Sequence, residues 1–409
     1  MSTSSLFKHR NFTRLFFASS ISEFGSFVTD TGLMLYLFSI TNDSKSWLGI
    51  SKAVFILSYT LGTFIGGGLR NYSGFKNILL FSNLIRIPLL GFMIYTDNPT
   101  VLVCLSGFIA FFQGIFTPLR RALTNLFVPK EKIKKANSLT STTYAALHLI
   151  CPYIGAIIYT RLGTITPIFL GDLLTYIIAF ILILGLSDLK NINQKPSSPE
   201  ARFLFDFKFL SKHEHIKTMS IQYAIVGMMV GILIPLLLPY TIQVLKGTKE
   251  DYGIVMLCFG LGGLIGGLAS SKIGEYVSSN KLTVLGFFIE ANMLLIWIQF
   301  SNFLFSCALL IIWGSIVFIR IPAQFNFISE TIETKDLAMA HSIVQICFVI
   351  PNFLGGLVVA LFADMLPVKQ FYTYAGTVFC LVAFLRIFLS STHKFYKFQT
   401  KEIQRELVD

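Results

Sequence analysis

The sequence predicts an all-α membrane protein in which twelve transmembrane helices form two six-helix bundles related by pseudo-two-fold symmetry. The chain of 409 residues is 54% hydrophobic and only 13% charged, and its mean hydropathy is +0.69. Apolar runs of about 18 residues or more recur along it, as expected of membrane-spanning helices. Sequence patterns of the first half also return in the second. A soluble globular protein is therefore excluded.

The apolar runs predict twelve spans, which place both ends of the chain on one side of the membrane. The first span, 11–39, follows basic residues without a small-residue cleavage site, so we expect an uncleaved helix rather than a signal peptide. The six cysteines lie inside apolar runs without metal-ligand spacing and are interpreted as buried apolar residues. The remaining spans are expected at 47–69, 77–95, 100–121, 137–160, 166–187, 217–243, 251–271, 280–300, 304–327, 338–362 and 370–392.

Lysine and arginine are unevenly divided between the two sets of connections, and the net charge is +12. Because basic connections face the cytoplasm, this excess predicts that both termini are cytoplasmic, and it accounts for the charge without a nucleic-acid partner. The membrane is expected to be the bacterial inner membrane. The opposite side is expected to hold only Lys45, Lys52, Arg161, Lys246, Lys249 and Lys369.

The longest polar connection, 188–216, divides the chain. It predicts an N-terminal six-helix bundle at 1–187, a cytoplasmic linker at 188–216, a C-terminal bundle at 217–392 and a cytoplasmic tail at 393–409. The linker ends in the amphipathic stretch FLFDFKFL, which is expected to lie on the inner membrane surface.

The two halves share repeated patterns. Gly67 and Gly266, and likewise Pro152 and Pro351, are 199 positions apart, and a further block of matches is offset by 204. Duplicated six-helix halves around a midplane site are typical of secondary transporters.

The stretch FTPLRRALTNLFVPKEKIKKANSLTSTTYAALHLICPYIGAIIYT, residues 116–160, carries a likeness to a known family. A proline and arginine close the fourth span, a basic short helix follows, and "AN" opens the fifth. The chain resembles the major facilitator superfamily over nearly its whole length, and within it the macrolide-efflux and enterobactin-exporter group of drug and siderophore exporters. The resemblance implies a monomeric carrier that works by alternating access with proton antiport.

The superfamily's loop signature after the second span has counterparts here. Gly67, Gly74 and Lys76 match it, whereas Asn71 stands where relatives carry the aspartate that helps to hold the inner gate. The resemblance implies a gating role for these residues, and Asn71 retains hydrogen bonding without the charge.

The exporter signature of the fifth span is recognisable through Pro152 and Gly155. In the fourth span Gln113 and Gly114 match the relatives, but Ala110 stands in place of an arginine that is tied to proton coupling in many of them.

Two acids interrupt the first span. Glu23 and Asp30 are seven residues apart, close to two helical turns, so they share a face. A charge at mid-bilayer costs at least about 2.5–3.5 kcal/mol, so such a group faces a cavity or a partner. Either acid is expected to exchange a proton or bind a cationic substrate, unless it pairs with a base or a neighbouring helix. Asp172 and Glu290 are further intramembrane acids.

Several other residues are candidates for the substrate cavity. Arg320, inside the tenth span, could meet an anionic ligand or pair with an acid, and His148 could join a proton relay or be a neutral hydrogen-bonded histidine. The aromatic candidates are Phe24 and Phe27, and Gln113 is a polar one.

The sequence thus predicts export of a lipophilic or amphipathic small molecule, drug or siderophore, coupled to protons within the lipid bilayer. No phosphate-binding loop, catalytic triad or metal spacing is found, so no enzyme activity, metal or cofactor is expected. Two alternatives remain open: an importer of siderophores or nutrients on the same fold, and a membrane interaction or sensor protein that does not transport.

Overall fold

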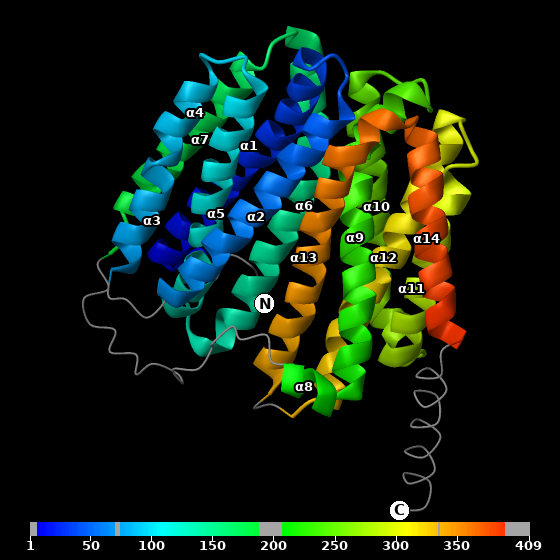
Figure 1. Ribbon diagram of the computed structural model, residues 1–409. Helices are drawn as coiled ribbons and strands as arrows, with labels where there is room; N and C mark the ends of the chain where they lie inside the picture. Colours follow the sequence, from blue (N-terminus) through cyan, green and yellow to red (C-terminus); the bar gives the residue numbers. More distant parts are fainter. Residues whose placement is uncertain (1–5, 70–73, 188–206, 334–335, 389–409) are drawn as a thin grey trace, which may run out of the picture.

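The computed structural model describes residues 6–69, 74–187, 207–333 and 336–388, and within these ranges it contains helices and turns but no strand (Figure 1). The first half contains α1 (Arg10–Ile40), α2 (Lys45–Leu69), α3 (Phe75–Leu84), α4 (Arg86–Met93), α5 (Pro99–Phe127), α6 (Lys130–Leu162) and α7 (Thr166–Leu184). The second contains α8 (Phe207–Lys212), α9 (Glu214–Gln243), α10 (Lys249–Gly274), α11 (Ser279–Trp297), α12 (Phe303–Thr331), α13 (Leu337–Phe362), the short 3₁₀ helix η2 (Ala363–Met365) and α14 (Val368–Phe388).

The helices supply the twelve predicted spans, with α3 and α4 together forming the third. Nine spans within the described residues are long and apolar enough to cross a membrane by length and composition alone. The other three are α1, α11 and α14. The helix α1 is less apolar because it buries polar residues, among them Ser19, Ser22 and Glu23, against its neighbours.

Several helix boundaries differ from the sequence-based prediction. The predicted span 77–95 is broken at Ile85, because Pro88 has no backbone N–H to donate to the carbonyl of Leu84. The basic segment that begins at Lys130 is not a separate short helix but the first turns of α6. Helix α9 begins at Glu214, three residues inside the predicted linker.

The helices α1–α7 lie on one side of the molecule and α9–α14 on the other (Figure 1). The two sides meet where α2 packs on α13 and α9 and where α6 packs on α10. Helix α1 lies inside the first group, in contact with α2, α5, α6 and α7. The largest buried apolar cluster takes residues from both groups, such as Phe38 and Leu237. Many side chains of α1, such as Leu35 and Leu37, are therefore enclosed by neighbouring helices.

Glycine contacts reveal the internal symmetry at atomic detail. A Cβ at Gly62 of α2 would overlap the carbonyl of Phe111 in α5, and 200 positions later a Cβ at Gly262 of α10 would overlap the carbonyl of Ile311 in α12. These pairs let helix backbones touch, which is the usual role of small residues between transmembrane helices.

The same offset relates α1 and α6 to α9 and α13. Gly155 faces the carbonyl of Val28, and Gly355 faces the carbonyl of Met228. Gly66 likewise faces the carbonyl of Ile115 in α5, and Gly266 faces that of Ser315 in α12. Gly66 and Gly266 are therefore equivalent, and the 199-residue match of Gly67 with Gly266 was one position out of register.

Candidate functional site

Glu23, in the middle of α1, contacts α5. Its Oε2 accepts a hydrogen bond from Nε2 of Gln113 at 3.1 Å, and both side chains are buried. The positive charges that act on the carboxylate come from Arg120, Arg86 and Arg121. The Nε of Arg120 is buried without a hydrogen-bond partner. Arg86 and Arg120 are buried and Arg121 is exposed, so proton uptake by Glu23 would change the charge balance around two buried guanidinium groups.

Asp30 lies two turns further along α1 and pairs with Lys52 of α2. Nζ of Lys52 is 2.7 Å from Oδ2 and 3.0 Å from Oδ1 of Asp30. The Asp30 side chain keeps 42% of its surface accessible, against 14% for Lys52. Lys52 was expected in a connection on the far side of the membrane, but it lies two turns into α2. Position 52 also lies inside the predicted span 47–69, and a lysine there could have indicated an ion pair within the membrane.

An aromatic wall lies between α1 and α6. The ring of Phe27 is 5.1 Å from that of Tyr144 and 4.9 Å from that of His148, centroid to centroid. The charges of Asp30 and Lys52 act on His148. Phe24 on α1 is 37% exposed. The candidates Phe27 and His148 thus lie together near the ion pair, on a surface suited to flat apolar ligands.

Arg320 and Glu290 form a buried ion pair between α12 and α11. Nε of Arg320 is 2.6 Å from Oε2 of Glu290, and Nη2 is 3.2 Å from Oε1. Nη1 donates a hydrogen bond to Oε1 of Gln324 at 2.6 Å. Arg320 is 4% exposed and Glu290 2%. The predicted substrate arginine is therefore enclosed, with its charge matched by Glu290.

Asp172 of α7 faces α1. A Cβ at Gly25 would overlap its carboxylate, and Thr175 donates a hydrogen bond from Oγ1 to its Oδ1 at 3.0 Å. The hydroxyls of Ser26 and Tyr176 are 3.0 Å apart across the same helix contact. These contacts fasten α7 to α1 in a polar layer.

The gating-loop candidates lie at the ends of α2 and α3. Gly67 is in the last turn of α2, Gly74 precedes α3, and Asn71 lies outside the described residues. Nζ of Lys76 donates a hydrogen bond to the carbonyl of Leu186, just beyond α7, at 2.7 Å. This contact lies within the first half of the chain.

The exporter-motif candidates lie in α6 where it crosses α1. Pro152 is buried within the helix. A Cβ at Gly155 would be 2.6 Å from the carbonyl oxygen of Val28. Gly155 therefore permits the close approach of α6 to α1 that positions His148 beside Phe27.

The two halves are held together by polar contacts at one end of the molecule, the end that contains the α1–α2 turn, the α9–α10 turn and η2. We call this the joined end. Asp364 of η2 accepts hydrogen bonds at the start of α2: from Oγ of Ser44 at 2.7 Å, from the backbone N–H of Lys45 at 2.7 Å and from that of Ser46 at 3.3 Å. Nζ of Lys45 donates to the carbonyl of Leu366 at 2.6 Å. One half of the protein thus caps a helix of the other.

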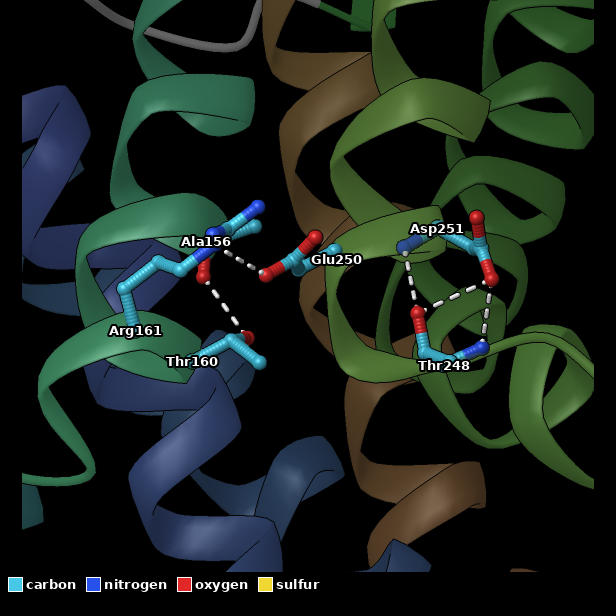
Figure 2. Close-up of polar contacts among 6 residues, drawn as sticks. All are labelled: Ala156, Thr160, Arg161, Thr248, Glu250 and Asp251. Atoms are coloured by element: carbon cyan, nitrogen blue, oxygen red, sulfur yellow. Dashed lines mark hydrogen bonds and ion pairs between the residues drawn. The ribbon is translucent and has the colours of Figure 1, made fainter.

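A second set of contacts at the joined end links α6 and α1 to α10. Figure 2 shows Arg161 of α6 beside Glu250 of α10, with Nε 3.2 Å from Oε1. Asp251, one residue further, closes a capping box with Thr248 at the start of α10. Nζ of Lys249 donates to Oγ of Ser39 in α1 at 2.6 Å. Several of the basic residues expected on this sparsely basic side therefore join the halves.

Comparison with known proteins decides the family. The Major Facilitator Superfamily model matches residues 15–356. The chain belongs to this superfamily. Macrolide efflux protein A of Streptococcus pyogenes is 23% identical over 397 residues, which cover 92% of this chain and 96% of that protein. Chloramphenicol resistance protein CraA of Acinetobacter baumannii is 23% identical, with 82% of this chain and 83% of that protein covered.

Solved structures agree on the superfamily fold. A variant of the nucleoside transporter NupG superposes with a TM-score of 0.78 at 11% identity, covering 93% of this chain and all of that one. A bacterial homologue of the iron transporter ferroportin, in an inward-facing state, gives a TM-score of 0.70 at 13% identity and covers 95% of this chain and 99% of that one. The prediction of a twelve-helix transporter fold is thus confirmed, and the chain is a multi-pass membrane protein of a family that acts on small molecules.

Proposed function

We propose that the protein exports a lipophilic or amphipathic small molecule, a drug or a siderophore, across the bacterial inner membrane by proton antiport. The efflux and resistance proteins that match most of its length support an exporter. The observation that carries the proposal is the arrangement on α1: a buried carboxylate at Glu23, an accessible one at Asp30 and the aromatic side chains of Phe24 and Phe27.

The ligand is proposed to bind against the aromatic wall, near the accessible carboxylate of Asp30 and its partner Lys52. A cationic amphiphile would compete with Lys52 for the carboxylate of Asp30. Glu23, which accepts a hydrogen bond from Gln113 and is influenced by the charges of Arg120 and Arg86, would take up the proton. Burial disfavours the charged form of a carboxylate. Glu23 is proposed to exchange its proton as the cavity alternates between the two sides of the membrane.

The protein is proposed to work as a monomer in the bilayer, with bundles at 1–187 and 217–392 that rock about the site, a linker at 188–216 and a tail at 393–409. The basic connections support a cytoplasmic location for both termini. The joined end then faces outward, where polar contacts hold the two halves together in the described conformation. Export requires the contacts of the joined end to break.

A transport assay tests this function. Everted membrane vesicles containing the protein are energised by respiration, and accumulation of radiolabelled erythromycin or chloramphenicol is measured. In parallel, metabolites retained in cells and released to iron-poor medium are compared with and without the protein. Accumulation that a protonophore abolishes, or a compound released only when the protein is present, supports export. Uptake into intact cells instead would establish an importer, and no flux of any compound would contradict transport.

Asp364→Ala is expected to favour opening of the joined end. The substitution removes the acceptor of three donors at the start of α2. Loss of a helix cap costs about 0.5–2 kcal/mol, so the open-to-joined ratio should rise by roughly 2- to 30-fold. The measurement is the distance distribution between spin labels at exposed Thr164 and Lys246, in a background without the native cysteines.

Glu250→Ala is the matched control at the same end. It breaks an ion pair whose arginine side chain is 74% exposed, and exposed pairs contribute about 0–1 kcal/mol. A much smaller change in the distance distribution is expected. Equal shifts in the two variants would show that Asp364 has no special part in holding the joined end.

A further inference from the structure

A long apolar groove runs down the outside of the second half, remote from the aromatic wall. It lies between α9, α13 and α14 and has a volume of about 1030 Å³. Its walls include Met228 and Ile232 of α9, Leu354 of α13 and Val378 of α14. Leu354 is 42% exposed and Val378 61%, so the groove is open to the surrounding membrane.

The groove exists because the internal repeat is broken at two positions. In the first half, Gly25 and Gly32 of α1 let α7 lie directly on that helix. The pairing of Gly155 with Val28 and of Gly355 with Met228 fixes the equivalence of α1 and α9 at 200 positions. The equivalents of the two glycines are therefore Ile225 and Ile232, and both line the groove.

Branched side chains at these positions hold α14 away from α9, where the first half has a close helix contact. The space between α1 and α7 is thus closed in the first half, whereas the equivalent space between α9 and α14 is open. Tyr372 of α14 still reaches α9, where its hydroxyl donates to the carbonyl of Leu233 at 2.7 Å. Helix α14 is therefore tied to α9 near the joined end, and the groove extends from there towards the start of α9.

One end of the groove is polar and basic. Lys217, in the first turn of α9, lines it and is exposed, and Ser220 lies one turn further. Leu210 of α8 closes this end. From Lys217 to Leu233 the helix rises by roughly 24 Å, which exceeds one leaflet of a hydrocarbon core of about 30 Å. The shape and charge match a long apolar tail with an anionic head at the basic end of the molecule.

We propose that this groove binds a phospholipid of the adjoining leaflet, with its acyl chains between α9 and α14 and its anionic headgroup at Lys217. The apolar walls would supply affinity in common with any lipid tail, and Lys217 would supply the preference for a negative headgroup. This site is separate from the proposed transport site on α1.

Native mass spectrometry of the purified full chain tests the proposal. The protein is mixed with equal amounts of phosphatidylglycerol and phosphatidylcholine of the same acyl length, and retained lipid is measured. Wild type is expected to retain phosphatidylglycerol preferentially. Lys217→Gln should lower that preference at least five-fold while phosphatidylcholine retention persists, since the exposed side chain is not needed for folding. Ala375→Trp, which fills the groove from α14, should lower retention of both lipids at least five-fold.

Ile178→Trp is the matched control. Ile178 is 44% exposed on α7, the first-half counterpart of α14, and α7 packs directly on α1 through Gly25 and Gly32. This variant should leave retention unchanged. Equal retention of the two phospholipids by wild type, or unchanged retention in Lys217→Gln, would overturn the headgroup assignment. Unchanged retention in Ala375→Trp, or displacement of the lipid by erythromycin at transport concentrations, would overturn the groove as a lipid site.

Discussion

Glu23→Gln is expected to reduce proton-driven efflux at least ten-fold while the protein folds and inserts normally. Glutamine keeps the shape of the side chain and an oxygen that can accept the hydrogen bond from Gln113, now made at 3.1 Å. It cannot take up or release a proton, and it leaves Arg120 facing a neutral group. The measurement is accumulation of the transported compound in everted vesicles over a range of pH values, with the amount of protein determined in the same membranes.

Glu131→Gln is the control for this variant, since Glu131 is an exposed acid in the first turn of α6. Its efflux should equal that of wild type. Downhill exchange of substrate without a proton gradient should survive in Glu23→Gln, because binding at the aromatic wall does not use the proton. Unchanged energised efflux with an unchanged pH profile would remove Glu23 from coupling.

The fold could be predicted from the sequence because lipid imposes a simple rule. Every backbone polar group in the bilayer must be satisfied within its own segment, so apolar length alone locates most helices. Local chemistry decided the exceptions. Pro88 divides the third span into α3 and α4, and α6 extends back to Lys130 because its first turns lie beyond the apolar core. Helix α1 was still recognised, although its buried polar residues leave it outside the nine helices that, in the described part of the chain, qualify as spans by length and composition.

The partners of the intramembrane charges were harder to predict. Glu290 and Arg320 are 30 positions apart, and nothing local indicates that α11 and α12 bring them together. The pair of Asp30 and Lys52 was missed because Lys52 was assigned to a connection. Asp364 contacts α2 from the other half of the chain, and no periodic pattern in the sequence indicates this long-range contact. Sequence patterns thus located the charges, whereas their pairing depends on tertiary packing.

Glu290→Leu alone is expected to lower the free energy of unfolding by about 3–5 kcal/mol, the usual cost of breaking a buried ion pair by removing one partner. The carboxylate accepts two hydrogen bonds from Arg320, at 2.6 and 3.2 Å. Without it, a guanidinium that is 4% exposed keeps its charge in a low-dielectric interior, and Gln324 is the hydrogen-bond partner that remains among the described residues. The measurement is denaturant-induced unfolding in mixed micelles, monitored by the fluorescence of the tryptophans.

The double variant Glu290→Leu with Arg320→Met separates charge compensation from packing. Replacing a buried pair by apolar residues of similar volume is often neutral or stabilising, so stability should return to within about 1 kcal/mol of wild type. If efflux returns as well, the role of Arg320 is to compensate the charge of Glu290 and not to bind the substrate. If the double variant is stable but no longer moves anionic compounds while still moving neutral ones, Arg320 contributes to substrate recognition after the helices rearrange. A double variant as unstable as Glu290→Leu would contradict charge compensation and assign the loss to the shape of the side chains packed against Gly286.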